Sequence, residues 1–535
     1  MVASAVAAPA RHQGARAAWP PVFAVIPAAL VGAAMMLPIA YLLIRTLSAG
    51  AGAWDLLARA SVFDTLVRTT ALAVTVTAAT TAIAVPLAWL TVRTDLPLRR
   101  VWSVLTVLPL VIPSYVGAMV VVAALGPKGM LQDALAVDRV PEIYGFPGAA
   151  LTLTLLTYPY VLLSVRAGLW NLDPALEEVS RGLGHGAWST FRRVTLPQLR
   201  PAVAAGALLV ALYTLSDFGA VSLLRFNSFT RVIYMQYETA FDRTLAAATS
   251  LVLVVLALAL LLVEARARGR SRYHRAATGT ARKASVVRLG RWRWPALAFV
   301  ASVVLFALVM PMAVLGFWVI RGLLAGESLG FVWDAALSSL YVSVLAALAT
   351  LAAALPVAFI TVRHSSWVSA LLERITYTGF ALPGIVVALA LVYFGARYAT
   401  PFYQTLGLLV FAYVMLFLPV AVGTIRASLL QIHPHVEEAA RSLGRSPLAV
   451  FLTVTLPLLR SGLLASAAGV FLVTMKELPA TLILSPIGFK TLATATWSAT
   501  SAAFFARAAA PALLLIALSS LPVAFLNLRE QGLGR

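Results

Sequence analysis

Long apolar runs constrain this chain more than any other feature of its sequence. Twelve runs reach the roughly 20 residues that a helix needs to cross a bilayer. Only 11% of the residues are charged and 61% are hydrophobic, too few polar side chains to cover soluble domains. Outer-membrane barrels alternate polar and apolar residues in short segments, unlike this chain. The sequence predicts an all-α polytopic membrane protein with spans near 21–44, 66–92, 101–125, 148–170, 201–224, 244–263, 295–320, 337–362, 375–396, 405–425, 461–484 and 503–526.

The spans form two sets of six on either side of a basic, polar segment. The first run is longer than the apolar core of a signal peptide, so we expect it to remain as the first span. The predicted parts are an N-terminal tail, a first half, a basic linker, a second half and a C-terminal tail. These parts cover residues 1–20, 21–263, 264–294, 295–526 and 527–535.

The charge of the chain reports its orientation. The formal net charge is +21, and most of the Lys and Arg residues fall in the tails, the linker and alternate loops, all on one side of the predicted membrane. Such residues are enriched in cytoplasmic loops, so both termini are expected in the cytoplasm. This distribution argues against nucleic acid as the partner and for a lipid bilayer. The chain has no cysteine, which excludes disulfides and thiolate metal sites.

The two halves repeat each other. Residues 174–200 and 434–460 match at a constant offset of 260, with 13 of 27 positions identical. A second patch, Thr91-Val92-Arg93, matches Thr361-Val362-Arg363 at an offset of 270. Because each half has an even number of spans, the copies have the same orientation and are related by a parallel pseudo-two-fold axis.

The most similar stretch is a predicted cytoplasmic loop in each half. Pro174 and Pro434 suit the first turn of a short helix, and Gly184 and Gly444 suit its left-handed end. Asp173 is a good cap for the first copy, and His433 is a poorer one for the second.

Each loop helix is expected to carry an apolar stripe. Leu176, Val179 and Leu183 fall on one face at helical spacing, beside Glu and Arg. Such a helix suits a groove on a partner protein, although a helix resting on lipid head groups would look similar. The segment that follows is expected to end before Pro197 and Pro457.

The loops resemble the EAA loop of permease subunits of bacterial ABC importers. The second copy reads Glu438-Ala439-Ala440, then Gly444, Val454 and Leu456-Pro457. The first copy keeps the spacing with Glu178, Gly184, Val194 and Leu196-Pro197, but has Val179 and Ser180 where the family has alanines. The resemblance implies a type I ABC importer permease in which each loop (171–200 and 427–460) is a coupling helix. It places these residues at the contact with the ATP-binding subunit: Glu177, Glu178, Arg181, Gly184, Leu196, Pro197, Glu437, Glu438, Ala439, Ala440, Arg441, Gly444, Leu456 and Pro457.

No nucleotide site is expected on this chain. A phosphate-binding loop needs Gly-Lys-Ser/Thr, and only Lys490 precedes Ser or Thr, with Phe489 before it. We expect a transport subunit that is not an enzyme and has no catalytic residue or cofactor of its own. ATP and Mg would be bound by two copies of a separate subunit, and a periplasmic or extracytoplasmic binding protein would deliver the substrate. We expect this binding protein to contact loops 225–243 and 485–505. The chain itself is expected to be a multi-pass protein of the bacterial inner membrane.

Few charges lie inside the predicted spans. Asp217 and Glu477 are 260 residues apart, and Lys476 precedes Glu477. Buried ionisable groups usually mark a path, a gate or a pairing. The three residues are therefore candidates for the translocation path, and the alternative is that they only brace the helices.

The stretch 475–484 resembles the matching part of double-length ferric iron permeases, and the two-in-one architecture is also similar to thiamine permeases. The resemblance implies ferric iron as substrate, with thiamine or another small solute as the alternative. No resident metal site is expected, because all six His residues fall in predicted cytoplasmic segments. The pair His433 and His435 fits a loop.

Two other classes remain as alternatives. Twelve spans in two parallel halves also suit an ion-coupled secondary transporter. The matched loops and the scarcity of membrane charges argue against it. A membrane-embedded enzyme would need a clustered site, and no span contains His or Cys.

Overall fold

The computed structural model describes most of the chain, and its described part consists of helices joined by turns and loops, with one isolated β-bridge, Thr94 to Val287. The described residues are 21–48, 55, 57–127, 129–136, 142–238, 243–268, 286–328, 330–364 and 366–533, with no side chain described over 523–533. The predicted tail 1–20 and most of the predicted linker lie outside these residues.

Eleven helices in the described part are long and apolar enough to cross a membrane, and a shorter apolar helix covers Gly384–Tyr398. The prediction of an all-α polytopic membrane protein is confirmed. The helices from the N-terminus to the predicted linker are α1 (Val22–Ser48), α3 (Ala60–Arg93), α4 (Arg99–Leu105), η2 (Leu108–Val111), α5 (Ser114–Leu125), α6 (Met130–Leu135), α7 (Phe146–Asn171), α8 (Pro174–Gly182), α9 (Ala187–Thr190), η3 (Phe191–Thr195), α10 (Leu196–Ser216), α11 (Gly219–Leu223), α12 (Phe229–Glu238) and α13 (Arg243–Arg268). Those that follow are η4 (Gly290–Trp292), α14 (Arg293–Val304), η5 (Leu305–Val309), α15 (Met310–Leu324), α16 (Gly330–Arg363), α17 (Trp367–Thr378), η6 (Gly379–Ala381), α18 (Gly384–Tyr398), η7 (Thr400–Phe402), α19 (Leu406–Leu429), α20 (Pro434–Ser442), α21 (Pro447–Val450), η8 (Phe451–Thr455), α22 (Leu456–Met475), α23 (Pro479–Leu484), α24 (Leu492–Ser501) and α25 (Phe505–Leu533).

Four of the predicted spans are broken helices, and the breaks repeat between the halves. Pro113 and Pro383 have extended backbone immediately before α5 and α18, so the expected spans 101–125 and 375–396 are each divided there. The expected span 201–224 is divided after α10, and the span 461–484 is divided after α22. Broken helices inside a membrane occur where protein or a cavity satisfies the freed backbone groups.

The described helices pack into two compact units, and neither unit is one half of the sequence. Unit 1 contains Met1–Arg59, Val232–Val254 and Arg321–Arg535, and unit 2 contains Ala60–Arg231 and Val255–Ile320. Hence α1, the first span of the first half, belongs with the second half. In the same way α14, which begins the second half, belongs with the first.

The core of unit 2 is built on α7. Leu153, Tyr158 and Leu162 of α7 are fully buried in one cluster with residues of α3 and α10. Val300 of α14 and Ala307 of η5 are fully buried in the same cluster. The other side of η5 is apolar and exposed, with Phe306 at 52%, as a lipid-facing surface requires.

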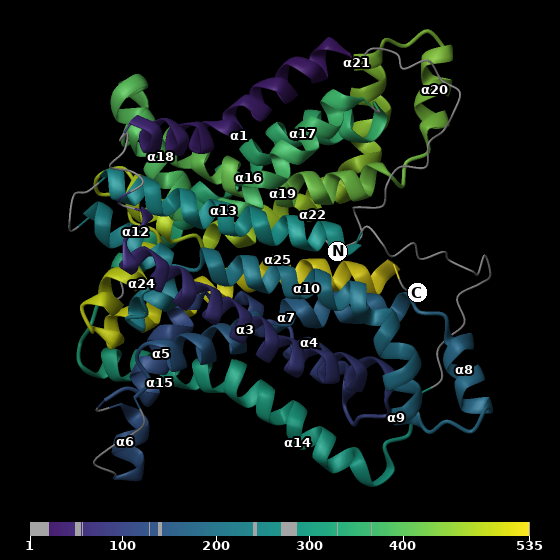
Figure 1. Ribbon diagram of the computed structural model, residues 1–535, viewed down its shortest axis with the longest axis vertical. Coiled ribbons are helices and arrows are strands. Elements are labelled where there is room, and N and C mark those ends of the chain that lie inside the picture. Colours follow the sequence, from purple (N-terminus) through teal and green to yellow (C-terminus); the bar gives the residue numbers. More distant parts are fainter. Residues whose placement is uncertain are drawn as a thin grey trace. The chain divides into compact units, whose positions relative to one another are not determined.

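In unit 1, α1 packs on α16, α17 and α18 (Figure 1). Its buried side is made of small and flexible residues, Ala24, Ala28, Gly32 and Met35. A Cβ on Gly32 would lie 2.8 Å from a methyl carbon of Leu372 in α17. Close approach of this kind is how membrane helices gain packing energy without a hydrophobic driving force.

Gly206→Ala is expected to destabilise unit 2. The added Cβ would lie 2.6 Å from the Cα of Val161, where α10 crosses α7, and backbone cannot move aside easily. Overpacking of this kind costs about 1–3 kcal/mol of unfolding free energy, so the thermal unfolding midpoint in detergent should fall. Gly316→Ala in α15 is the control, because its Cβ would meet nothing within 4 Å. Equal midpoints for the two variants would contradict the prediction.

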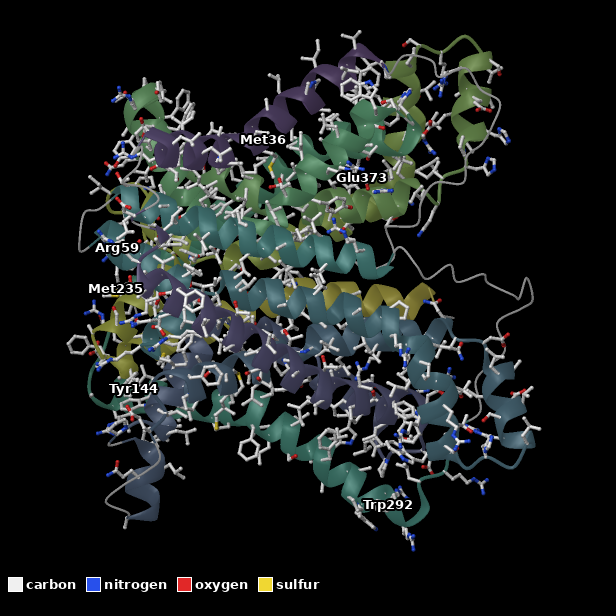
Figure 2. All side chains as sticks on the ribbon, in the orientation of Figure 1. Met36, Arg59, Tyr144, Met235, Trp292 and Glu373 are labelled. Carbon is white, nitrogen blue, oxygen red and sulfur yellow. The ribbon has the colours of Figure 1, made fainter. Side chains whose placement is uncertain are left out.

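Two arginines at matched positions of the repeat bind different partners. Arg166 of α7 donates to the carbonyl of Ser103 at 2.8 Å and to the hydroxyls of Thr91 and Thr106. Its counterpart Arg426 of α19 pairs with Glu373 of α17, which Figure 2 labels. The two halves therefore have arginines at matching positions, but these arginines contact different partners.

Candidate functional site

The two loop helices, α8 and α20, start and end as their sequences predict. The Asp173 side chain accepts from the backbone N–H of Ala175 at 3.0 Å. The poorer cap of the second copy, His433, accepts from His435 at 3.4 Å. Gly184 and Gly444 both have φ +84°, in the left-handed region that favours glycine.

Gly184→Ala is expected to loosen the end of α8. A left-handed alanine costs about 1–2 kcal/mol, although its Cβ would meet nothing within 4 Å. Hydrogen exchange should quicken over the last turn of α8, where His185 N–H donates to the carbonyl of Ser180. Gly182→Ala is the matched control, since Gly182 ends the same helix without a positive φ. Equal exchange in both variants would contradict the prediction.

A buried carboxylate holds α8 in place. Glu177 is 5% exposed, and its Oε1 accepts a hydrogen bond from the Thr195 hydroxyl at 3.0 Å. The Arg93 guanidinium lies 3.7 Å from the same oxygen and donates to the carbonyl of Leu169 at 2.9 Å. Arg181, one turn along α8, lies 3.8 Å from Oε2. The carboxylate therefore ties α8 to the end of α3 and to the turn that begins α10.

The second copy repeats this cluster around Glu437, which is 2% exposed. Arg363 donates to Glu437 Oε1 from Nη2 at 3.0 Å and from Nε at 3.2 Å, and the Thr455 hydroxyl donates to it at 3.1 Å. Arg363 also donates to the carbonyl of Ile432 at 3.0 Å, and Arg441 lies 3.9 Å from Oε2. We call the two sets, Arg93–Glu177–Thr195 and Arg363–Glu437–Thr455, the loop clamps.

The neighbouring glutamates point away from the clamps. Glu178 and Glu438 are exposed. His435 Nδ1 lies 2.8 Å from Glu438 Oε2, and this hydrogen bond lowers the pKa of Glu438. In the described structure, therefore, the first glutamate of each pair anchors the helix internally, and the second is the one that a partner could reach.

The outer face of each loop helix is apolar and exposed. Leu176, Val179 and Leu183 are 50%, 61% and 74% exposed on α8. Val436 and Leu443 are 45% and 82% exposed on α20. Ala439 is exposed between these two, Ala440 is half-buried, and Arg441 is exposed beside them. Exposed apolar rows rimmed by charge are typical of protein interaction sites.

The prediction that the next segment ends before Pro197 and Pro457 is wrong. In each copy a π-helical turn, η3 or η8, leads into the following helix without a break. In the first copy the N–H of Leu196 reaches back to the carbonyl of Phe191. The widened turn tolerates the proline, which has no N–H to donate. Leu196, Pro197, Leu456 and Pro457 thus begin α10 and α22, and Leu196, Pro197 and Leu456 are half-buried while Pro457 is exposed.

Asp217 follows the end of α10 and caps α11. It is 6% exposed, and its Oδ1 accepts from the backbone N–H groups of Ala220 and Val221 at 3.0 and 3.3 Å. The Thr230 hydroxyl donates to its carbonyl oxygen at 2.5 Å. Asp217 therefore stabilises the helix break.

Glu477 repeats this role in the second copy, two residues after the end of α22. Its two carboxylate oxygens accept from Leu478 and Ala480 N–H groups, each at 2.8 Å. The Thr481 hydroxyl donates to its carbonyl oxygen at 2.9 Å. Lys476 is half-buried beside it.

Sequence reasoning did not assign a role to Arg93, Arg363, Thr195 or Thr455. The signal was present, because both pairs are identical in the two copies.

Two stretches of the chain, residues 81–271 and 351–535, match the family described as binding-protein-dependent transport system inner membrane component. The chain belongs to this family. It is a multi-pass inner-membrane permease of the ABC importer type, with the family domain present twice.

The permease is similar over its length to a curated relative. It is 35% identical over 95% of its chain to the Fe(3+)-transport system permease protein FbpB 2 of Haemophilus influenzae, and covers 98% of that protein. Two Escherichia coli proteins match shorter stretches. These are the sulfate transport system permease protein CysT (30% identical, 26% of this chain, 51% of that protein) and the molybdenum transport system permease protein ModB (31%, 25% and 58%).

Proposed function

We propose that this permease imports ferric iron by alternating access, driven by ATP hydrolysis on a separate subunit. The observation that carries the proposal is the pair of clamped loop helices with exposed apolar faces. The proposal of iron is supported by the full-length similarity to a permease named for Fe(3+) transport.

Two copies of an ATP-binding subunit would dock on α8 and α20, one on each. ATP and Mg would be bound there, and closure of the subunits would move the loop helices. The loop clamps would pass this movement to α3 and α10 in one copy and to α16 and α22 in the other, because the buried carboxylates join these elements. The two halves would then move together, and the path would open to one side of the membrane as it closes to the other.

The proposed orientation follows the positive-inside rule. Both termini and both loop helices face the cytoplasm, and an extracytoplasmic binding protein docks on the opposite side, at segments 225–243 and 485–505, which contain the short helices α12 and α24. Asp217, Lys476 and Glu477 lie beside the broken helices of the proposed path. Broken helices at matching positions are where transporters place substrate.

The test is uptake of radioactive ferric iron into vesicles that contain the permease, its ATP-binding subunit and an iron-loaded binding protein. We expect uptake that needs ATP and the binding protein and that persists when the proton gradient is collapsed. Uptake driven by a proton gradient without ATP would support the ion-coupled alternative. ATP-dependent uptake of thiamine or another solute, with none of iron, would keep the ABC mechanism and reject the substrate.

A further inference from the structure

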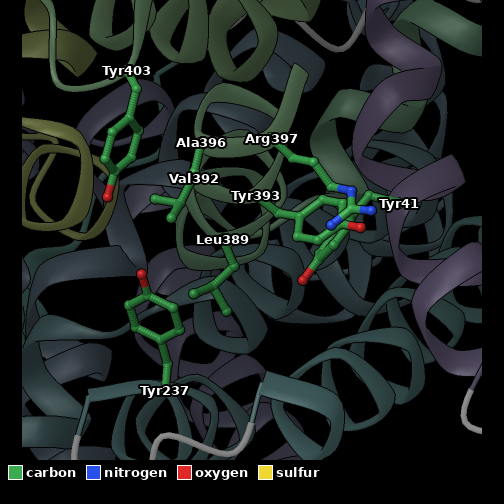
Figure 3. Close-up of a pocket in the computed structure, with 8 residues that line it drawn as sticks. All are labelled: Tyr41, Tyr237, Leu389, Val392, Tyr393, Ala396, Arg397 and Tyr403. Atoms are coloured by element: carbon green, nitrogen blue, oxygen red, sulfur yellow. The ribbon is translucent and has the colours of Figure 1, made fainter. Parts of the chain in front are cut away.

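A cavity of about 240 Å³ lies within unit 1 and is lined by four tyrosines and one arginine (Figure 3). These residues come from four separate segments: Tyr41 from α1, Tyr237 from α12, Tyr393 and Arg397 from α18, and Tyr403 from the turn after η7. Leu389, Val392 and Ala396 complete the lining. We call this the tyrosine cavity.

The polar side chains of the cavity lie in two groups (Figure 3). The hydroxyl ends of Tyr237 and Tyr403 point toward each other, while Tyr41, Tyr393 and Arg397 lie together (Figure 3). The Tyr41 and Tyr393 ring centroids are 4.8 Å apart. The cavity opens at the surface, because Ala396 and Arg397 are exposed.

The tyrosine cavity lies at the opposite end of unit 1 from α20. Tyr403 lies three residues before the start of α19, and α20 follows the other end of α19 (Figure 1). With 24 residues, α19 is about 36 Å long, which is close to the thickness of a bilayer. If the ATP-binding subunit docks on α20, the cavity faces the side on which the substrate arrives.

We propose that the tyrosine cavity receives ferric ion through its phenol oxygens as the ion leaves the binding protein. This inference rests on the proposed function. Ferric iron is a hard cation that accepts tyrosine oxygen as a ligand. Among the described residues, no group of three or more His, Cys, Asp or Glu could hold a metal ion. The phenols of the tyrosine cavity are a set of oxygen donors from four segments of unit 1.

The charges of such a site balance. Each phenol that binds the ion releases one proton, so three phenolates neutralise one Fe³⁺. A fourth phenolate would leave one negative charge beside the Arg397 guanidinium, which is positive. A site without lasting excess charge can release its ion to the next position, as a transport path requires.

Two residues of the cavity lining, Tyr393 and Arg397, have no like residue at the matching positions of the first half. At the offset of 270 that aligns Pro113 with Pro383, Tyr393 corresponds to Ala123 and Arg397 corresponds to Pro127. A scaffold role would be expected in both copies, as it is for the loop clamps. A receiving site for a single ion needs only one.

The test compares the wild type with Tyr393→Phe plus Tyr403→Phe. Phenylalanine keeps the ring and removes the oxygen, so the fold should persist. Tyr398→Phe is the matched control, because Tyr398 is on the same helix, is 69% exposed and does not line the cavity. The full permease in detergent is titrated with ferric nitrilotriacetate, and the visible charge-transfer absorption of iron(III)–phenolate is recorded. Iron uptake into vesicles is measured with the complete complex.

We expect the band in the wild type and in Tyr398→Phe, and its loss in the double variant. Loss of an outer-shell partner reduces the affinity or activity of a metal site by roughly 10- to 100-fold. Loss of two direct ligands should reduce iron uptake by the double variant by more than this. Docking of the ATP-binding subunit should be unchanged. No band in the wild type, or equal band and uptake in the double variant, would overturn the inference and leave the proposed function intact. A cavity that binds molybdate or sulfate through Arg397, and no iron, would also overturn it. Failure of the wild-type complex to import iron at all would reject the proposed substrate instead.

Discussion

Arg363→Ala is expected to abolish ATP-driven uptake while the permease still inserts in the membrane. The change leaves Glu437 buried without its strongest partner, and breaking a buried ion pair costs about 3–5 kcal/mol. The cost falls on the attachment of α20, because Arg363 donates two hydrogen bonds to Glu437 and one to the carbonyl of Ile432 just before that helix. Hydrogen exchange should therefore quicken over α20 first.

A double variant distinguishes two causes of this effect, the loss of the contact between Arg363 and Glu437 and the burial of an unpaired charge on Glu437. Arg363→Met with Glu437→Gln removes both charges and keeps an oxygen to accept from Thr455. Replacing both partners of a buried pair is often nearly neutral, so protection of α20 should recover relative to Arg363→Ala. Arg93→Ala should have the smaller effect, because Arg93 lies 3.7 Å from Glu177, against 3.0 Å for the second copy. Unchanged exchange and uptake in Arg363→Ala would show that the clamp does not hold α20.

Leu183→Asp with Leu443→Asp is expected to prevent assembly with the ATP-binding subunit. The two side chains are 74% and 82% exposed at the ends of the loop helices. Burying one leucine at an interface contributes about 1.5–3 kcal/mol, so losing two should weaken assembly by a hundredfold or more. The measurement is co-purification of the ATP-binding subunit with the permease.

Leu324→Asp serves as the control for this pair. Leu324 is 85% exposed at the end of α15, away from both loop helices in the chain. Adding a charge there should leave assembly intact. Full recovery of the ATP-binding subunit with the Leu183 and Leu443 variant would mean that α8 and α20 do not dock it through their apolar faces.

The part of the structure that could be predicted is the part encoded in short stretches of sequence. Apolar length predicted the spans. Gly184 and Gly444, with prolines ten residues earlier, predicted both ends of the loop helices. Local chemistry is enough for such features, because capping and a positive φ depend on residues within one or two turns.

The role of Glu177 could not be predicted in the same way. It stands next to Glu178 in the same motif, and the sequence treats them alike. The difference comes from Arg93, at the end of a helix 84 positions earlier in the chain, which faces one glutamate and not the other. The identical Thr-Val-Arg patches placed Arg93 and Arg363 at matching positions of the repeat, but spacing alone could not say which residue each one binds.

The continuity of α10 through Pro197 also needed the structure. Proline near the end of a helical pattern predicts a stop, and only the π turn shows how the missing N–H is tolerated. The sequence also could not predict which unit α1 and α14 belong to, for a different reason. Lipid-facing and protein-facing sides are both apolar, so the periodicity that identifies a buried face in water is weak here.

The first span of each half packs in the unit formed mainly by the other half, α1 in unit 1 and α14 in unit 2. This arrangement sets an order in which the units can form during synthesis. Translation delivers α1 to the membrane long before α16, α17 and α18, on which it packs, have been made. Until then, its small-residue side has only lipid or a chaperone to meet. Unit 1 can be completed only after the ribosome has passed the linker, so a nascent chain stopped at the linker would hold neither unit whole. A permease split there into two polypeptides would have to be inserted together to assemble.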